Sequence, residues 1–111
     1  MAANVDSKFP GAEKHEISLE EAKLHIQRHK KNPIHPNHHG GSFDRAAIDK
    51  ILAHPECKGL RYYHGRDEEG KPNLVLVGVD AAGKDITKAS IMERGGNCPP
   101  FCDVTSELLK A

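Results

Sequence analysis

The chain contains no tryptophan and only five other aromatic residues, three phenylalanines and two tyrosines. A core with so few aromatic rings is expected to be aliphatic and modest in size. The 111 residues are enough for one domain with a single hydrophobic core, and no internal repeat or second domain is visible.

The chain also lacks an excess of charge of either sign, because sixteen Lys and Arg residues balance sixteen Asp and Glu residues. Such a chain has no overall field to attract nucleic acid or anionic lipid, so we expect no nucleic-acid partner. No apolar run approaches the ~20 residues of a membrane span. The first sixteen residues lack the apolar segment of a secretory signal. These absences predict a cytoplasmic protein that does not contact the membrane.

Cysteine is scarce as well, with three residues in the whole chain. An odd and small number of cysteines argues against a disulfide framework, so reduced thiols are expected.

Two helices are predicted in the first half of the chain. Residues 1–16 show no periodicity and are expected to form a flexible N-terminal arm, followed by a single α+β domain over residues 17–111. Ser18 and Glu21 form a capping box at the start of a helix over 18–31. Ser42 is predicted to cap a second helix, which ends at His54-Pro55. One side of this helix is an apolar stripe that is expected to be buried. The predicted stripe is Phe43, Ala47, Ile48, Ile51 and Leu52.

The densest apolar run lies in the second half and predicts a β-hairpin. Residues 74–79 are rich in Val and bounded by turn residues, which favours a strand covered on both faces. Residues 59–64 form its partner, and the charged segment 66–72 between them is a turn. Gly78 leaves a gap on one face, where a bulge or a close neighbour fits. Residues 86–92 form a third strand or a short helix.

The predicted fold class is therefore α+β. Two N-terminal helices pack on a small antiparallel β-meander of two to three strands. An irregular C-terminal segment, Cys98-Pro99-Pro100-Phe101-Cys102, follows the glycine-rich break at residues 95–97, and the last residues, with Leu108 and Leu109, form a final helical turn.

Three segments, KGLRYYHG, LVLVGVDAAGKDI and CPPFC, resemble a family of small uncharacterised bacterial proteins. In that family a Lys-Gly-(Ile/Leu)-Arg strand precedes a Leu-Val-Leu-Val-Gly-Val-Asp strand, and a Cys-Pro-Pro-x-Cys follows. The resemblance covers about residues 42–102 and implies no particular activity. The histidines of residues 35–39 are not part of the family's pattern.

Cys98 and Cys102 are candidate metal ligands, because thiolates bind zinc and other transition metals. Held in polyproline II by the two prolines, their Cα atoms would lie about 12 Å apart. A disulfide needs less than about 7 Å, and a cis bond before Pro100 would bring them together. Three interpretations stay open: reduced cysteines in a rigid loop that packs Phe101 on the core, a metal site, and a redox pair.

Eight histidines are many for this length, and six of them fall between His15 and His39. His35, His38 and His39 lie in a predicted loop and complete the candidate metal site with the two C-terminal cysteines. His25 and His29 stand one helical turn apart, but the Glu of the zinc-protease signature is absent between them. A solvated surface explains a histidine-rich loop equally well.

Two functions of different classes follow. The first is a non-enzymatic bacterial domain that acts through a protein partner or as a homodimer, using an exposed sheet edge or the apolar C-terminal segment. The alternative is a metal-binding protein that serves as sensor, carrier or structural zinc site. An enzyme with a cysteine nucleophile ranks third.

Overall fold

A computed structural model describes residues 11–93 and 95–111 of the chain. Its elements are, in chain order, a short 3-10 helix (Ala12–Lys14), α1 (Leu19–Lys31), β1 (Gly40–Ser42), α2 (Arg45–Leu52), β2 (Gly59–Arg66), β3 (Pro72–Val79), β4 (Ile91–Met92), β5 (Gly96–Cys98) and α3 (Glu107–Lys110). They form two antiparallel sheets, β2-β3-β4 and β1-β5, which confirms the α+β class. Of the predicted N-terminal arm, residues 1–10 lie outside the described residues.

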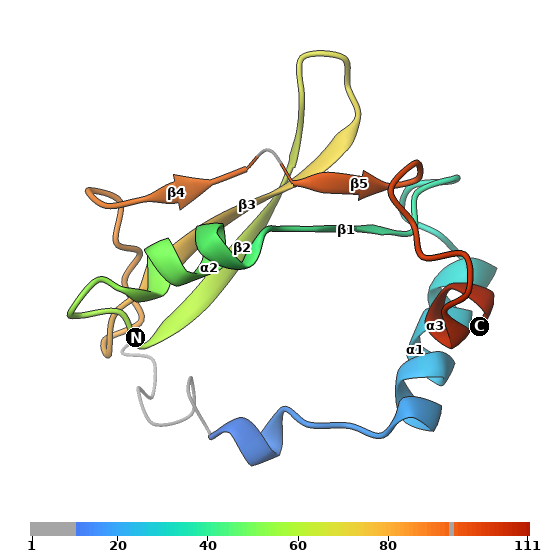
Figure 1. The fold of residues 1–111 in the computed structure, drawn as a ribbon, viewed down its shortest axis with the longest axis horizontal. Helices are drawn as coiled ribbons and strands as arrows, with labels where there is room; N and C mark the ends of the chain where they lie inside the picture. Colours follow the sequence, from blue (N-terminus) through green and yellow to red (C-terminus); the bar gives the residue numbers. More distant parts are fainter. Residues whose placement is uncertain (1–10, 94) are drawn as a thin grey trace.

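The β2–β3 hairpin is the largest element of the fold (Figure 1) and confirms the prediction. It is longer than expected, since Arg66 already pairs with Pro72. The reason is a tight turn: Asp67 Oδ1 accepts hydrogen bonds from the amides of Glu69 and Lys71, both at 2.9 Å. Gly70 occupies the left-handed region with φ 82°, which glycine adopts without strain.

One part of the hydrophobic core lies between α2 and the hairpin, and another lies on the opposite face of β3. Its buried side chains are Ile51, Leu76, Val77 and Val79. Leu76 and Val77 point to opposite faces of β3 because side chains alternate along a strand, so β3 is covered on both faces as predicted. Of the predicted helical stripe only Ile51 is buried; Leu52 is 48% exposed and Phe43 lies before the helix.

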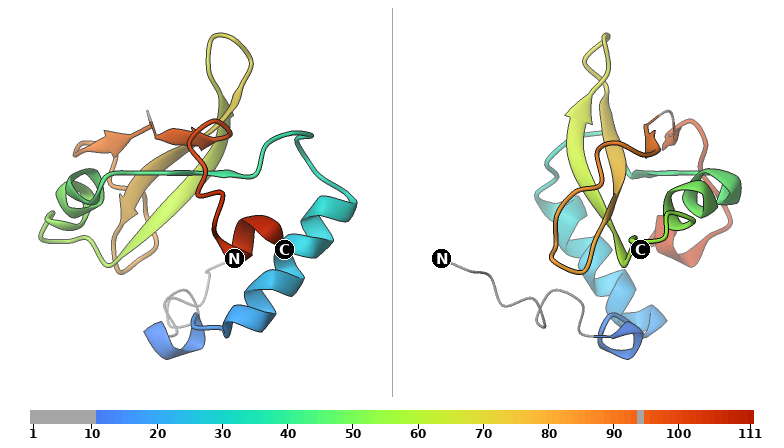
Figure 2. Two further views of the ribbon diagram at one scale, coloured as in Figure 1. Left: turned by 45° about the vertical axis from the view of Figure 1, so that its right-hand side comes forward. Right: turned by 90° about the vertical axis from the view of Figure 1, so that its left-hand side faces the viewer.

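Helix α1 begins with the predicted capping box, in which the Glu21 amide donates to Ser18 Oγ at 3.1 Å. We expected α1 to pack on the three-stranded sheet beside α2, and this expectation is wrong. Instead it contacts α3 (Figure 2), where Lys30 Nζ donates to the carbonyl of Leu109 at 2.7 Å. The reason is that α1 has no fully buried residue, while Lys30 complements the negative end of α3.

A two-stranded ribbon, which was not predicted, connects the two ends of the molecule. In it Gly40 pairs with Cys98 and Ser42 with Gly96, and Figure 1 shows it running from the hairpin to α1 and α3. Ser42 therefore lies in a strand, and the prediction that it caps α2 is wrong. The N-cap is Asp44, whose side chain makes no capping hydrogen bond.

The remaining elements are short. The third strand of the meander is only Ile91–Met92, which pairs with Leu76 and Val77. The final helical turn is confirmed as α3, capped by Ser106, whose Oγ accepts from the Leu108 amide at 3.1 Å. Within the described residues, every helix is too short or too polar to cross a lipid bilayer.

Candidate functional site

Six of the eight histidines of the chain line one cavity of about 390 Å³. We call it the histidine cavity. Its histidines are His25, His29, His35, His38, His39 and His64. The three loop histidines predicted from the sequence therefore share one site with three histidines that were not part of the predicted set.

Separate elements bring these side chains together. His25 and His29 come from α1, and the loop that follows α1 carries the three predicted histidines into β1. This loop is attached to the C-terminal segment by the His39 amide, which donates to the carbonyl of Cys98 at 2.7 Å. His64 comes from β2, where it is paired with Leu74 of β3.

The rest of the cavity wall is mainly apolar. Ile26, Phe43 and Leu74 contribute side chains to it, with the amide of Asn73 as a polar group. No Asp, Glu, Lys or Arg of the described residues belongs to the lining. The imidazoles are therefore its only groups that change charge near neutral pH.

Like charges and burial act together on His38. Its pKa is lowered below the usual value, first by burial and then by His35, His39 and His29, whose positive charges would repel a protonated ring. The rings of His35 and His38 meet edge to face with their centroids 6.3 Å apart. The protonated form of His38 is therefore disfavoured.

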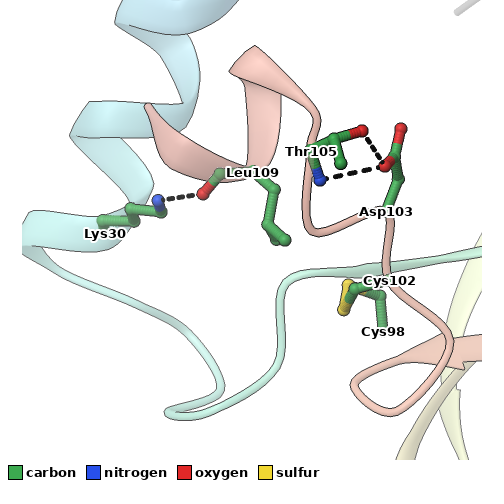
Figure 3. Close-up of a disulfide and its surroundings, with 6 residues drawn as sticks. All are labelled: Lys30, Cys98, Cys102, Asp103, Thr105 and Leu109. Atoms are coloured by element: carbon green, nitrogen blue, oxygen red, sulfur yellow. Dashed lines mark hydrogen bonds between the residues drawn. A yellow bond between two sulfur atoms is a disulfide. The ribbon is translucent and has the colours of Figure 1, made fainter.

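The two predicted cysteine ligands form a disulfide, shown in Figure 3. Their Cα atoms are 4.8 Å apart, so the separation expected for a polyproline segment is wrong. The peptide bonds before Pro99 and Pro100 are both cis, and the backbone turns back on itself. The expectation of reduced thiols is wrong for this pair, and Cys57 is the free cysteine.

The C-terminal loop also differs from the prediction in where Phe101 packs. Phe101 does not pack on the core as predicted, because its side chain is 71% exposed. It lies against Gly96 of β5, where its Cδ2 atom is 3.4 Å from the position of an added Cβ.

Joined to each other, the sulfurs of Cys98 and Cys102 do not offer thiolates to a metal ion. Among residues 11–93 and 95–111, no three or more His, Cys, Asp or Glu side chains are arranged to hold one. Zinc binding by the predicted set, Cys98, Cys102, His35, His38 and His39, would require this disulfide to be reduced and stays a prediction.

His64 had no signal in the sequence that connects it to the loop histidines. It lies in a strand, 25 residues after His39 in the sequence, and only the tertiary structure brings it to the lining of the cavity. His25 and His29 had a signal in their helical spacing.

A second polar cluster joins the hairpin to the turn that follows it. Arg61 Nη1 donates to Asp85 Oδ1 at 2.6 Å and to the carbonyl of Gly83 at 3.1 Å. The hydroxyl of Tyr63 donates to Asp85 Oδ2. The Tyr63 hydrogen bond first, and then Arg61, lower the pKa of Asp85, while burial opposes them. These contacts fasten two backbone segments to each other.

We expect Asp85→Asn to destabilise the chain at pH 7 and to matter less in acid. The pKa of Asp85 is lower in the folded state, so its charge favours folding above the unfolded pKa of about 4. That contribution is lost as the pH falls through the folded pKa. Urea unfolding midpoints at pH 7 and pH 3 measure the effect, and exposed Glu68→Gln is the control. A difference between wild type and Asp85→Asn that is equal at both pH values would contradict it.

Comparison of the chain with protein-family models, with curated proteins and with solved structures finds no match. The resemblance of its three segments to the small bacterial family stays a prediction.

Proposed function

We propose that this chain is a non-enzymatic interaction domain that binds a second copy of itself through the open edge of β2. The observation that carries the proposal is that β2, eight residues long, pairs with β3 alone among the described strands. An open edge of this length is a template for another strand.

The backbone groups of the edge can be assigned from the ladder. The Asp67 amide donates to the Lys71 carbonyl at 2.9 Å, whereas the Gly78 carbonyl accepts from Ile86 on the other side of β3. Since hydrogen-bonded and open pairs alternate in antiparallel sheets, Leu60, Tyr62 and His64 direct their amides and carbonyls away from β3. These groups are available to a second strand.

Side chains at the same edge favour association. Leu60 is 41% and Tyr62 60% exposed, so pairing would remove apolar surface from water. Among the described residues, more large hydrophobic side chains are exposed than buried, and Leu60 and Tyr62 at this edge belong to the exposed set.

A second copy fits the charges of the edge. Lys58 precedes β2, and Asp67, Glu68 and Glu69 follow it. Two copies related by a two-fold axis would run antiparallel along their β2 edges. Each Lys58 would then lie near the acidic turn of the other copy, which favours this orientation.

We expect the purified chain to be a dimer by light scattering, and Tyr62→Pro to weaken it at least about tenfold, or about 1.4 kcal/mol. Proline removes an outward amide that the single chain does not use, and edge strands tolerate it. Tyr62→Ala is the matched control, because it removes the ring and keeps the amide.

A wild-type chain that is monomeric at millimolar concentration would refute the proposal, and so would equal dissociation constants for the two variants. Circular dichroism establishes that Tyr62→Pro is folded. Should that variant unfold, Tyr62→Lys replaces it, because a lysine on an edge strand also opposes edge pairing.

The cytoplasmic location predicted from the sequence stays a prediction. In that compartment thiols are kept reduced, so the Cys98–Cys102 disulfide would persist there only if it resists the cellular reductants.

A further inference from the structure

We propose that the histidine cavity binds a small organic acid as its anion, with the carboxylate among the imidazoles and an apolar body against Ile26, Phe43 and Leu74. This site shares His64 with the proposed dimer edge of β2, but its other lining residues lie outside β2, so ligand binding does not require the dimer.

The size and walls of the cavity suit such a ligand. Its volume of about 390 Å³ falls in the range of small-molecule sites, ~300–1,000 Å³, which are usually apolar with a few placed polar groups. Ile26 comes from α1, Phe43 from the segment before α2 and Leu74 from β3. An apolar body between them would be covered from three sides.

The charge of the lining selects an anion. Every titratable group among the described residues of the lining is an imidazole, so the only charge that these residues can acquire is positive. A ligand with a negative charge is attracted by every protonated state of the cavity, and a ligand with a positive charge is repelled.

The charged groups around the cavity also bear on the preference for a negatively charged ligand. On α1, Arg28 Nη1 lies 3.5 Å from His25 Nδ1 and adds a positive charge. On the β3 side, Glu93 Oε1 accepts a hydrogen bond from Asn73 Nδ2 at 2.9 Å, and this carboxylate does not belong to the lining. From the loop and α1, His38 faces His35, His39 and His29.

The repulsion among these rings gives the ligand its pH dependence. Burial and the three neighbouring histidines lower the pKa of His38, and a carboxylate beside the rings would raise it again. Binding would therefore take up protons, and by linkage the affinity rises as the pH falls through the imidazole range.

A metal ion predicts the opposite dependence. Imidazole coordinates metals in its neutral form, so metal affinity falls as the histidines become protonated. The direction of the pH effect thus separates the two kinds of ligand.

The test is calorimetric titration of the full chain, without a histidine tag, with sodium octanoate at pH 6.0 and pH 8.5. We expect octanoate to bind about tenfold more tightly at pH 6.0, the effect of a shift of one unit in one imidazole pKa. Octanol, which has the same chain length and no charge, should show no such difference.

Variants connect the effect to the cavity. The double variant His29→Asn/His38→Asn should lose the pH dependence, whereas His54→Asn, which changes a histidine outside the lining, should retain it. If the double variant does not fold, the ring-proton titration of His38 in the wild-type chain serves instead, and octanoate should raise its midpoint.

Four results would overturn the proposal. They are no octanoate binding at pH 6.0, equal affinity at both pH values, an unchanged pH dependence in the double variant, and stoichiometric Zn²⁺ binding that weakens in acid while octanoate does not bind.

Discussion

A Gly78→Val variant is expected to lose about 3 kcal/mol of folding free energy, at the upper end of the cost of overpacking a core. A Cβ atom added at Gly78 would lie 2.9 Å from Cys57 Sγ and 3.3 Å from Ile51 Cγ2. Both neighbours are constrained. The Cys57 thiol lies 3.2 Å from the Gly59 carbonyl, to which it donates, and Ile51 is 3% exposed. Neither can move away without disturbing the contact between α2 and the hairpin.

The chain offers a matched control and a rescue for this prediction. A Cβ at Gly40 meets no atom within 4 Å, so Gly40→Ala should change the stability little. Cys57→Ala removes the nearest atom, so in a double-mutant cycle it should restore part of the stability that Gly78→Ala loses. The free energies come from urea unfolding. A fully stable Gly78→Val variant, or a cycle without coupling, would show that α2 does not lie against this strand.

Ile51→Ala is expected to cost about 2–5 kcal/mol, the usual range for removing a buried aliphatic side chain. Ile51 is the only buried residue of α2, and it contacts the strand at Gly78. The described core has few other buried side chains, so there is little material to fill the space. A loss of this size is a large part of the stability of a small domain.

The neighbouring residue is the control. Leu52 lies on the same helix and is 48% exposed, so Leu52→Ala should change the free energy of unfolding by less than about 1 kcal/mol. The same urea experiment measures both variants, with the denaturant slope checked for each. Equal losses for the two variants would mean that α2 is turned differently on the sheet.

Local signals explain why the hairpin and α1 were predictable. The Val-rich run around Val77 and Val79 requires cover on both faces, and the capping residues Ser18 and Glu21 lie three positions apart. Interactions between near neighbours decide both elements, so their residues carry the information. The gap at Gly78 was likewise visible as a missing side chain in an apolar run.

The helical stripe of α2 shows where such a signal is incomplete. Periodicity predicted that Ile48, Ile51 and Leu52 share a buried face, and only Ile51 is buried. A helix of eight residues on a sheet of only three strands is covered along a narrow strip. The number of its residues that become buried therefore depends on the size of the sheet.

The histidine cavity was foreseen only as a set of residue types. The sequence singled out His35, His38 and His39 and the spacing of His25 and His29, without a signal for His64. That they line one cavity depends on residues of α1, the loop after it and the hairpin facing the same space, and on the hydrogen bond from the His39 amide to the Cys98 carbonyl.

By itself, the sequence determined the α+β class, the hairpin, the capped first helix and the wealth of histidine. Only the tertiary structure decided the β1–β5 ribbon, the contact of α1 with α3, the Cys98–Cys102 disulfide and the cavity. The physical reason is range. Caps, turns and strand alternation act between residues a few positions apart, whereas Gly40 pairs with Cys98 across about half of the chain, and glycines leave no side-chain pattern that would indicate the pairing.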